Sequence, residues 1–161
     1  MIDDLTTARE MIRHTVATLA YRAAKPLRDV PAEFAAFRPK PGSRTAVEIL
    51  AHMGDLFDWG LSLAAGKEAW SDSVPMGWEQ EVSRFFASLK AFDDYLAGTQ
   101  EIHCPIGRLF QGPIADALTH TGQLAMLRSL FGAPIKPENY YKADITRGVV
   151  GSNQPPARRE F

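Results

Sequence analysis

Four stretches of this chain carry an apolar residue at every third or fourth position, and segments rich in glycine and proline separate them. This spacing places the apolar side chains on one face of an α-helix, and that face must be buried against a neighbouring helix. No alternation of apolar and polar residues is long enough to predict a strand. The pattern predicts an all-α, four-helix bundle with helices over about 4–28, 45–65, 77–97 and 112–131.

Local signals at the ends of these stretches support the helix assignments. Thr45 and Glu48 have the spacing of a capping box, in which each side chain binds a backbone N–H of the other. Residues 99–111 are expected to form a loop, after which Gly112 and Pro113 open the fourth helix, because proline is tolerated in a first helical turn. Glycines are expected to end the last three helices, at Gly66, Gly98 and Gly132.

The length and the periodicity predict one domain with a C-terminal extension. The chain has 161 residues, which suits a single domain, and the bundle is expected to occupy residues 1–135. Residues 136–161 show little periodicity. We expect Tyr140, Tyr141 and Ile145 to anchor the first part of this extension on the bundle, and the stretch from residue 151 to be extended or mobile.

Composition argues against several classes of partner and location. The formal net charge is −1 and the basic pair Arg158-Arg159 is short, so we expect no binding to nucleic acid. No apolar run approaches the roughly 18 residues needed to span a membrane, and the acidic start of the chain is unlike a signal peptide. Cys104 is the sole cysteine, which fits a reducing compartment. We therefore expect a cytoplasmic protein.

Two histidines stand where the helical pattern asks for leucine. His52 precedes Leu56 on the second stripe, and His120 precedes Leu124 on the fourth. Asp116 lies four residues before His120, so the two side chains share a helix face. A carboxylate buried beside them is costly unless it is paired or bound to metal. Two imidazoles and one carboxylate suit Zn²⁺, Ni²⁺ or Fe²⁺, and three protein ligands leave a coordination position open for water or substrate.

The same residues have simpler explanations. A single core histidine is more often only hydrogen-bonded, and an aspartate four residues before a histidine often forms a surface ion pair. Asp55 and Gln123, each three residues after one of the histidines, are candidates to orient the ligands or hold a bound water. Asp55 is equally consistent with a solvated helix face, and Gln123 with a hydrogen bond between helices.

Two segments resemble the signature stretches of the DinB-like (YfiT-like) bundle proteins, and the resemblance extends over residues 1–135. These segments are residues 45–52, TAVEILAH, and residues 116–124, DALTHTGQL. In that family a histidine early in the second helix joins a His-x-x-x-His pair that precedes Gly-Gln in the fourth. His52 and His120 match the first and third histidines, and Gly122-Gln123 matches the Gly-Gln, whereas Asp116 stands in place of the middle histidine.

The resemblance implies helices in up-down-down-up order, frequent dimers and a metal-dependent activity on a small molecule. Some members are hydrolase-like, and relatives transfer or isomerise with low-molecular-weight thiols such as mycothiol, bacillithiol or glutathione. We therefore expect a hydrolase or a thiol-dependent S-transferase, active as a homodimer, with His52, Asp116 and His120 as metal ligands. The alternative is a non-catalytic dimeric module that binds a small molecule or a metal, and the aspartate at position 116 favours it.

Overall fold

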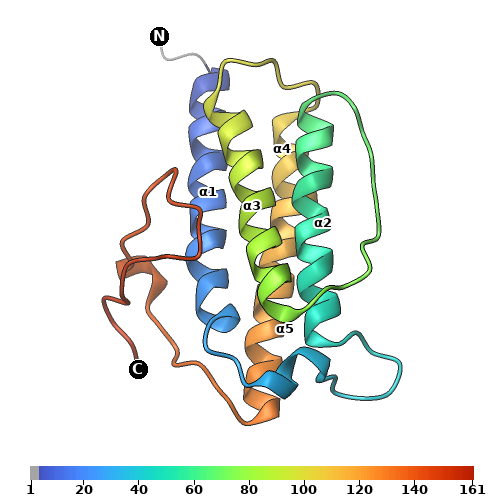
Figure 1. Cartoon of the computed structure of the whole chain (residues 1–161). Helices are drawn as coiled ribbons and strands as arrows, with labels where there is room; N and C mark the ends of the chain where they lie inside the picture. The colour runs from blue at the N-terminus through green and yellow to red at the C-terminus, as the bar shows by residue number, and fades with distance from the viewer. Residues whose placement is uncertain (1–3) are drawn as a thin grey trace.

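The computed structural model describes residues 4–161, and these residues form an all-helical protein (Figure 1). The described part of the chain contains no strand, apart from an isolated bridge between Glu138 and Glu160. None of its helices combines the length and the apolarity needed to cross a bilayer. Four long helices lie side by side: α1 (Asp4–Leu27), α2 (Ala46–Ala64), α3 (Trp78–Ala97) and α5 (Ala115–Phe131).

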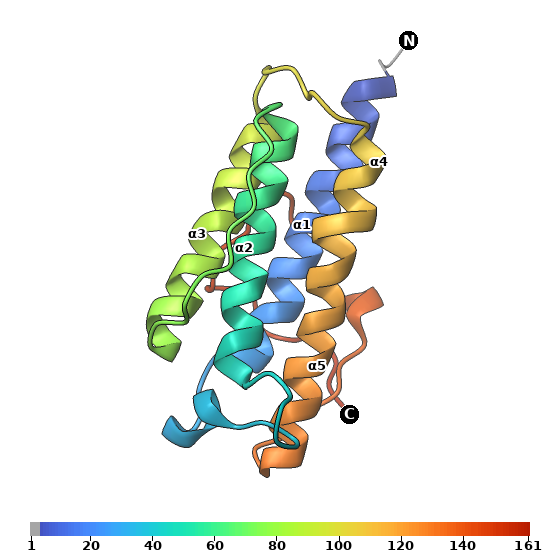
Figure 2. The same ribbon diagram turned by 90° about the vertical axis from the view of Figure 1, so that its right-hand side faces the viewer.

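The connections between the helices differ in length and path. A 3₁₀ turn, η1 (Ala32–Ala36), lies at one end of the molecule between α1 and α2. The connection between α2 and α3, residues 65–77, runs back along the outside of α2 (Figure 2). As a result α3 begins beside the start of α2 and runs alongside it.

The capping box at the start of α2 is confirmed. The Glu48 backbone N–H donates to Oγ1 of Thr45 over 3.3 Å, and the Thr45 N–H donates to Oε2 of Glu48 over 2.6 Å. At the other ends of the helices, Gly66 and Gly132 adopt φ values of +70° and +93°, which few other residues tolerate. These local signals were readable from the sequence because they depend only on neighbours in the chain.

The predicted start of the fourth helix is wrong. Helix α4 (Ile106–Leu109) begins within the segment expected to be a loop, directly after Pro105. It continues through one π-helical turn, η2 (Phe110–Ile114), into α5. Pro113 lies inside this turn, where it has no N–H to donate. The wider π turn accommodates the proline, so the residue that was expected to open the helix lies within it.

Aromatic side chains fill the centre of the bundle. Phe57 of α2 packs against Phe85 and Phe92 of α3, with ring centroids 6.1 and 5.6 Å apart. All three are fully buried, as is Phe34 of η1, which closes one end of the core against Trp78 and Phe131. The periodic apolar positions of the sequence therefore face this shared core.

The C-terminal extension packs along α1. Tyr140 contacts Tyr21 edge to face, and the Tyr21 hydroxyl donates to the carboxylate of Glu138. Lys25 pairs with Glu138 over 3.5 Å and with Glu160 over 3.1 Å. Tyr141, which was expected to anchor the extension, is 96% exposed, because its neighbour occupies the site on α1.

Candidate metal centre

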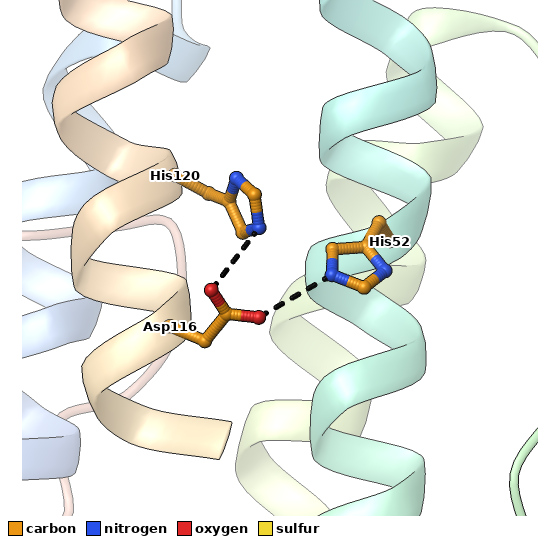
Figure 3. A group of neighbouring side chains, drawn as sticks. All are labelled: His52, Asp116 and His120. Atoms are coloured by element: carbon orange, nitrogen blue, oxygen red, sulfur yellow. Dashed lines mark hydrogen bonds and ion pairs between the residues drawn. The ribbon is translucent and has the colours of Figure 1, made fainter. Parts of the chain in front are cut away.

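The three candidate ligands converge between α2 and α5. His52 extends from α2, and Asp116 and His120 extend from successive turns of α5 toward it (Figure 3). Nε2 of His52 lies 3.4 Å from Oδ2 of Asp116, and Nε2 of His120 lies 3.4 Å from Oδ1. Each residue contributes one potential ligand atom, and these atoms all lie within 4.8 Å of one another. The group of three residues could therefore hold a metal ion.

The three side chains differ in exposure. The His120 and His52 side chains are 11% and 16% exposed, whereas that of Asp116 is 46% exposed. The expectation of a buried carboxylate is wrong, because Asp116 reaches water and needs no metal to neutralise it. Its exposure instead gives the cluster one side that is open to solvent, as a site for a dissolved ligand requires.

Gln123 contacts the second ring nitrogen of His120. Its side-chain oxygen lies 2.7 Å from Nδ1 of His120, and an amide oxygen can only accept a hydrogen bond. This contact favours the tautomer that carries a proton on Nδ1 and leaves Nε2 as the nitrogen that can bind a metal. Fixing a ligand imidazole through its second nitrogen is typical of metal-binding histidines. Gln123 thus lies where a residue that orients His120 would have to lie.

The two carboxylate oxygens of Asp116 face the two histidines. Oδ2 lies 3.4 Å from Nε2 of His52, and Oδ1 lies 3.4 Å from Nε2 of His120. A direct charge-assisted hydrogen bond would be shorter, at about 2.7–2.9 Å. Two ligand atoms that bind one tetrahedral ion at about 2.1 Å are separated by about 3.4 Å. Both separations are therefore compatible with a shared cation.

The pKa of His52 is lowered from its usual 6.5, in the direction that favours ligation. Burial of the ring is the main cause, and the positive charge of Arg44 and the proximity of His120 add to it. Asp116 opposes the shift by favouring the protonated ring. The imidazole is therefore neutral at neutral pH, which is the form that binds a metal.

Asp55 forms its hydrogen bonds with α3 and the segment 65–77. Its Oδ1 accepts from Nη1 of Arg84 over 3.0 Å and from Oγ of Ser73 over 2.6 Å. Its Oδ2 accepts from the Ser73 backbone N–H over 3.0 Å. These contacts tie the segment to the bundle, and His52 has no hydrogen bond to Asp55 among the residues that the structure describes.

Trp70 is a neighbour of the site that sequence reasoning did not identify. Its ring packs edge to face against His52, with centroids 5.6 Å apart, and against Trp59, with centroids 5.8 Å apart. The residue lies in the segment 65–77, which passes over α2. No local signal in the sequence indicates this contact, because it depends on the path of an irregular segment.

The remaining histidines and the cysteine lie outside the cluster. His14 and His103 are exposed, on α1 and in the connection after α3. Cys104 follows His103 and is partly buried, which raises the pKa of its thiol. A raised pKa disfavours the thiolate, so this cysteine lacks the character of a nucleophile.

Each residue of the cluster borders a different hollow. One, of about 450 Å³, is bordered by His120 and extends along α5 toward Leu130. A second, of about 200 Å³, is bordered by His52 and Ser73. The third, of about 440 Å³, is bordered by Asp116 and Trp59. A small molecule could therefore approach the three side chains from the solvent.

No protein-family model, curated protein or solved structure that was compared with this chain matches it.

Proposed function

We propose that this chain is a metal-dependent enzyme related to the DinB-like bundle proteins, acting in the cytoplasm on a small molecule as a hydrolase or a thiol-dependent S-transferase. The observation that carries the proposal is the convergence of two imidazoles and a carboxylate at ligand spacing. A carboxylate that is half exposed provides the open side that a reaction needs. A closed structural site would instead surround the ion with four protein ligands.

The family assignment has support from the course of the chain. We propose an up-down-down-up order for α1, α2, α3 and the α4–α5 unit. The long return of segment 65–77 along α2 supports it, because two neighbouring helices that run the same way need such a connection (Figure 2). The two segments that resemble the family signatures supply the residues that meet at the cluster.

Each residue has a separate part in the proposed reaction. A divalent ion held by His52, Asp116 and His120 would lower the pKa of a water or thiol bound to it. Gln123 would accept a hydrogen bond from Nδ1 of His120 and so leave Nε2 for the metal. Trp70 covers one side of His52 and limits the access of water there. The exposed edge of Asp116 leaves the cluster open to solvent on that side.

The donor set narrows the choice of metal. Two nitrogen donors and one oxygen donor favour Zn²⁺, Ni²⁺ or Fe²⁺ over Ca²⁺ and Mg²⁺, which prefer oxygen. Replacing a histidine by Asp116 adds a negative charge to the ligand set. That charge makes a bound water more basic than three neutral imidazoles would.

The first experiment is elemental analysis of the purified, untagged protein beside His120→Ala and His14→Ala. His14 is the matched control, because it is an exposed histidine of the same chain outside the cluster. We expect about one metal per chain in the parent and in His14→Ala, and almost none in His120→Ala. Added Zn²⁺ or Ni²⁺ should also raise the thermal midpoint of the parent and not of His120→Ala. The proposal fails if no variant holds metal even after soaking with Zn²⁺, Ni²⁺ and Fe²⁺.

Two assays on the loaded protein separate the two reaction classes. Hydrolysis of an activated ester tests for activation of water, and conjugation of glutathione to an aromatic chloride tests for activation of a thiol. In the first a carbon–oxygen bond of the ester is cleaved by water, and in the second a carbon–sulfur bond forms as chloride leaves. Whichever rate is lost in His120→Ala and kept in His14→Ala identifies the class.

A second candidate function is a non-catalytic dimeric module that binds a small molecule or a metal. The aspartate at position 116 favours it, because a carboxylate at 46% exposure can be satisfied by water and the neighbouring imidazoles alone. Such a protein would bind its ligand without turnover. Light scattering tests the proposed homodimer, and a monomeric mass at micromolar concentration would exclude it.

A further inference from the structure

The hollow beside His120 is an apolar groove. Ile49 of α2 forms one wall, and Met126, Leu127 and Leu130 of α5 form the other. His120 and Gln123 stand at the end nearest to the cluster. A volume of about 450 Å³ is within the range of sites that hold small molecules, which is roughly 300–1,000 Å³.

Two apolar side chains of the groove are exposed to solvent and are not part of the folded core. Met126 and Leu130 are 61% and 59% exposed, and they lie four residues apart on the same face of α5. Neighbouring exposed apolar side chains that border a hollow are typical of a surface that binds a ligand. They offer an apolar body a place to be buried next to His120.

The rim of the groove carries a positive charge that acts on Glu48 but forms no ion pair with it. Arg44 lies in the connection before α2, and it borders both the groove and the hollow beside His52. Among the side chains that the structure describes, residues 6–161, its guanidinium takes part in no ion pair, whereas seven other arginines and lysines are paired with carboxylates. Its charge reaches the site, since it contributes to the lowered pKa of His52. A planar guanidinium matches the two oxygens of a carboxylate.

We propose that this groove is the substrate subsite of the metal centre, and that it takes a small carboxylate with an apolar body, paired through its carboxylate with Arg44. This inference rests on the proposed function, because the ligand is a substrate only if the chain is an enzyme. Binding of the ligand in the groove does not itself require the metal. The apolar body lies against Met126 and Leu130, and Arg44 at the rim holds the charged end. Arg44 also borders the hollow beside His52, so it places the charged end of the molecule between the groove and the metal centre.

The test compares an acid with its alcohol. Binding of 4-phenylbutyrate and of 4-phenylbutan-1-ol is followed by protein-detected NMR titration, with metal-loaded and metal-free protein. Arg44→Gln is compared with Arg38→Gln, an exposed arginine six residues earlier that does not border the groove. Leu130→Gln is compared with Met11→Gln, since Met11 is 63% exposed on α1 and lies outside the groove.

We expect the parent to bind the acid roughly three- to tenfold more tightly than the alcohol, with or without metal, because the preference comes from one ion pair at a partly exposed site. Arg44→Gln should abolish the preference and Arg38→Gln should keep it. Leu130→Gln should lower the affinity for both ligands several-fold, and Met11→Gln should leave both affinities unchanged.

The inference is overturned by any of three results in metal-free protein. These are equal affinity for acid and alcohol, a preference that survives Arg44→Gln, and an absence of binding by both. Metal content measured on the same samples separates this failure from failure of the proposed function. If the protein holds metal but binds neither ligand, the metal centre is supported and the subsite is refuted. If the protein prefers the acid through Arg44 but holds no metal, the groove is supported as a binding site and the proposed enzyme is refuted.

Discussion

Replacing Gly54 by alanine is expected to destabilise the protein, although alanine is the better helix former by about 1 kcal/mol. Gly54 lies in the middle of α2 and is buried. A Cβ atom at this position would lie 2.8 Å from Cζ of Arg84 and 2.9 Å from its Nη1. The absence of a side chain at position 54 therefore makes room for the guanidinium of Arg84.

The guanidinium cannot move aside without loss, because three groups hold it. Its Nη1 donates to Asp55 over 3.0 Å, its Nε donates to Glu81 over 2.8 Å, and its Nη2 donates to the carbonyl of Ala51 over 2.6 Å. The Asp55 and Glu81 side chains are only 5% and 1% exposed. A shift of the guanidinium would leave part of their charge uncompensated in the interior.

The expected magnitude follows from two opposing effects. Removing one partner of a buried ion pair costs about 3–5 kcal/mol, and a displacement that weakens the pair costs a part of that. The gain in helix propensity offsets about 1 kcal/mol. We expect Gly54→Ala to lower the free energy of unfolding by about 1–3 kcal/mol, measured by urea denaturation at neutral pH.

A double-mutant cycle with Arg84→Met tests the cause. Arg84→Met alone should cost about 3–5 kcal/mol, because it leaves both carboxylates without a cation. In that background the steric conflict is reduced and the helix propensity of alanine remains. Gly54→Ala should then be neutral or stabilise by up to about 1 kcal/mol. A stabilising Gly54→Ala in the parent, or the same loss in both backgrounds, would refute the reasoning.

Three further predictions concern the helix cap, the site histidine and the C-terminal extension. Thr45→Ala should cost about 1 kcal/mol in urea denaturation, because it removes the cap of α2. The Thr45 backbone N–H, and to a lesser extent its hydroxyl, lower the pKa of Glu48, so this contribution should be present above about pH 4.5 and be lost as the pH falls further. Thr45→Ala keeps the backbone N–H and removes the hydroxyl, so its loss of stability at low pH should be smaller than in the parent and not absent. Burial and Arg44 lower the pKa of His52 below 6.5, so the unfolded chain takes up the proton first. Metal-free protein should therefore lose stability as the pH falls below about 6.5, and His52→Gln should lose less stability between pH 7 and 5. An equal loss in both proteins would mean that the ring is protonated in the folded state. Glu138→Ala removes the partner of Tyr21 and Lys25, so trypsin should cut the extension faster than in the parent, whereas an unchanged rate would mean that these contacts do not hold it.

Much of the bundle could be predicted from the chain alone. The apolar stripes identified α1, α2 and α3 within a residue or two of their ends, because helix burial has a fixed period. The Thr45–Glu48 cap was equally local. The start of the last helical unit could not be predicted in this way. A proline usually opens a helix, and only the π turn around Pro113 allows this proline to lie inside the helical unit.

The candidate site divides in the same way. The spacing along the chain predicts that Asp116 and His120 share a face, because four residues make about one helical turn, and His52 is recognisable as a polar residue on an apolar stripe. The packing of the helices was needed to show that His52 and Asp116 meet, that Asp116 is half exposed, and that Asp55 pairs with Arg84. It also placed Trp70 on His52. Such contacts depend on how helices pack and on the path of irregular segments, for which the chain carries no periodic signal.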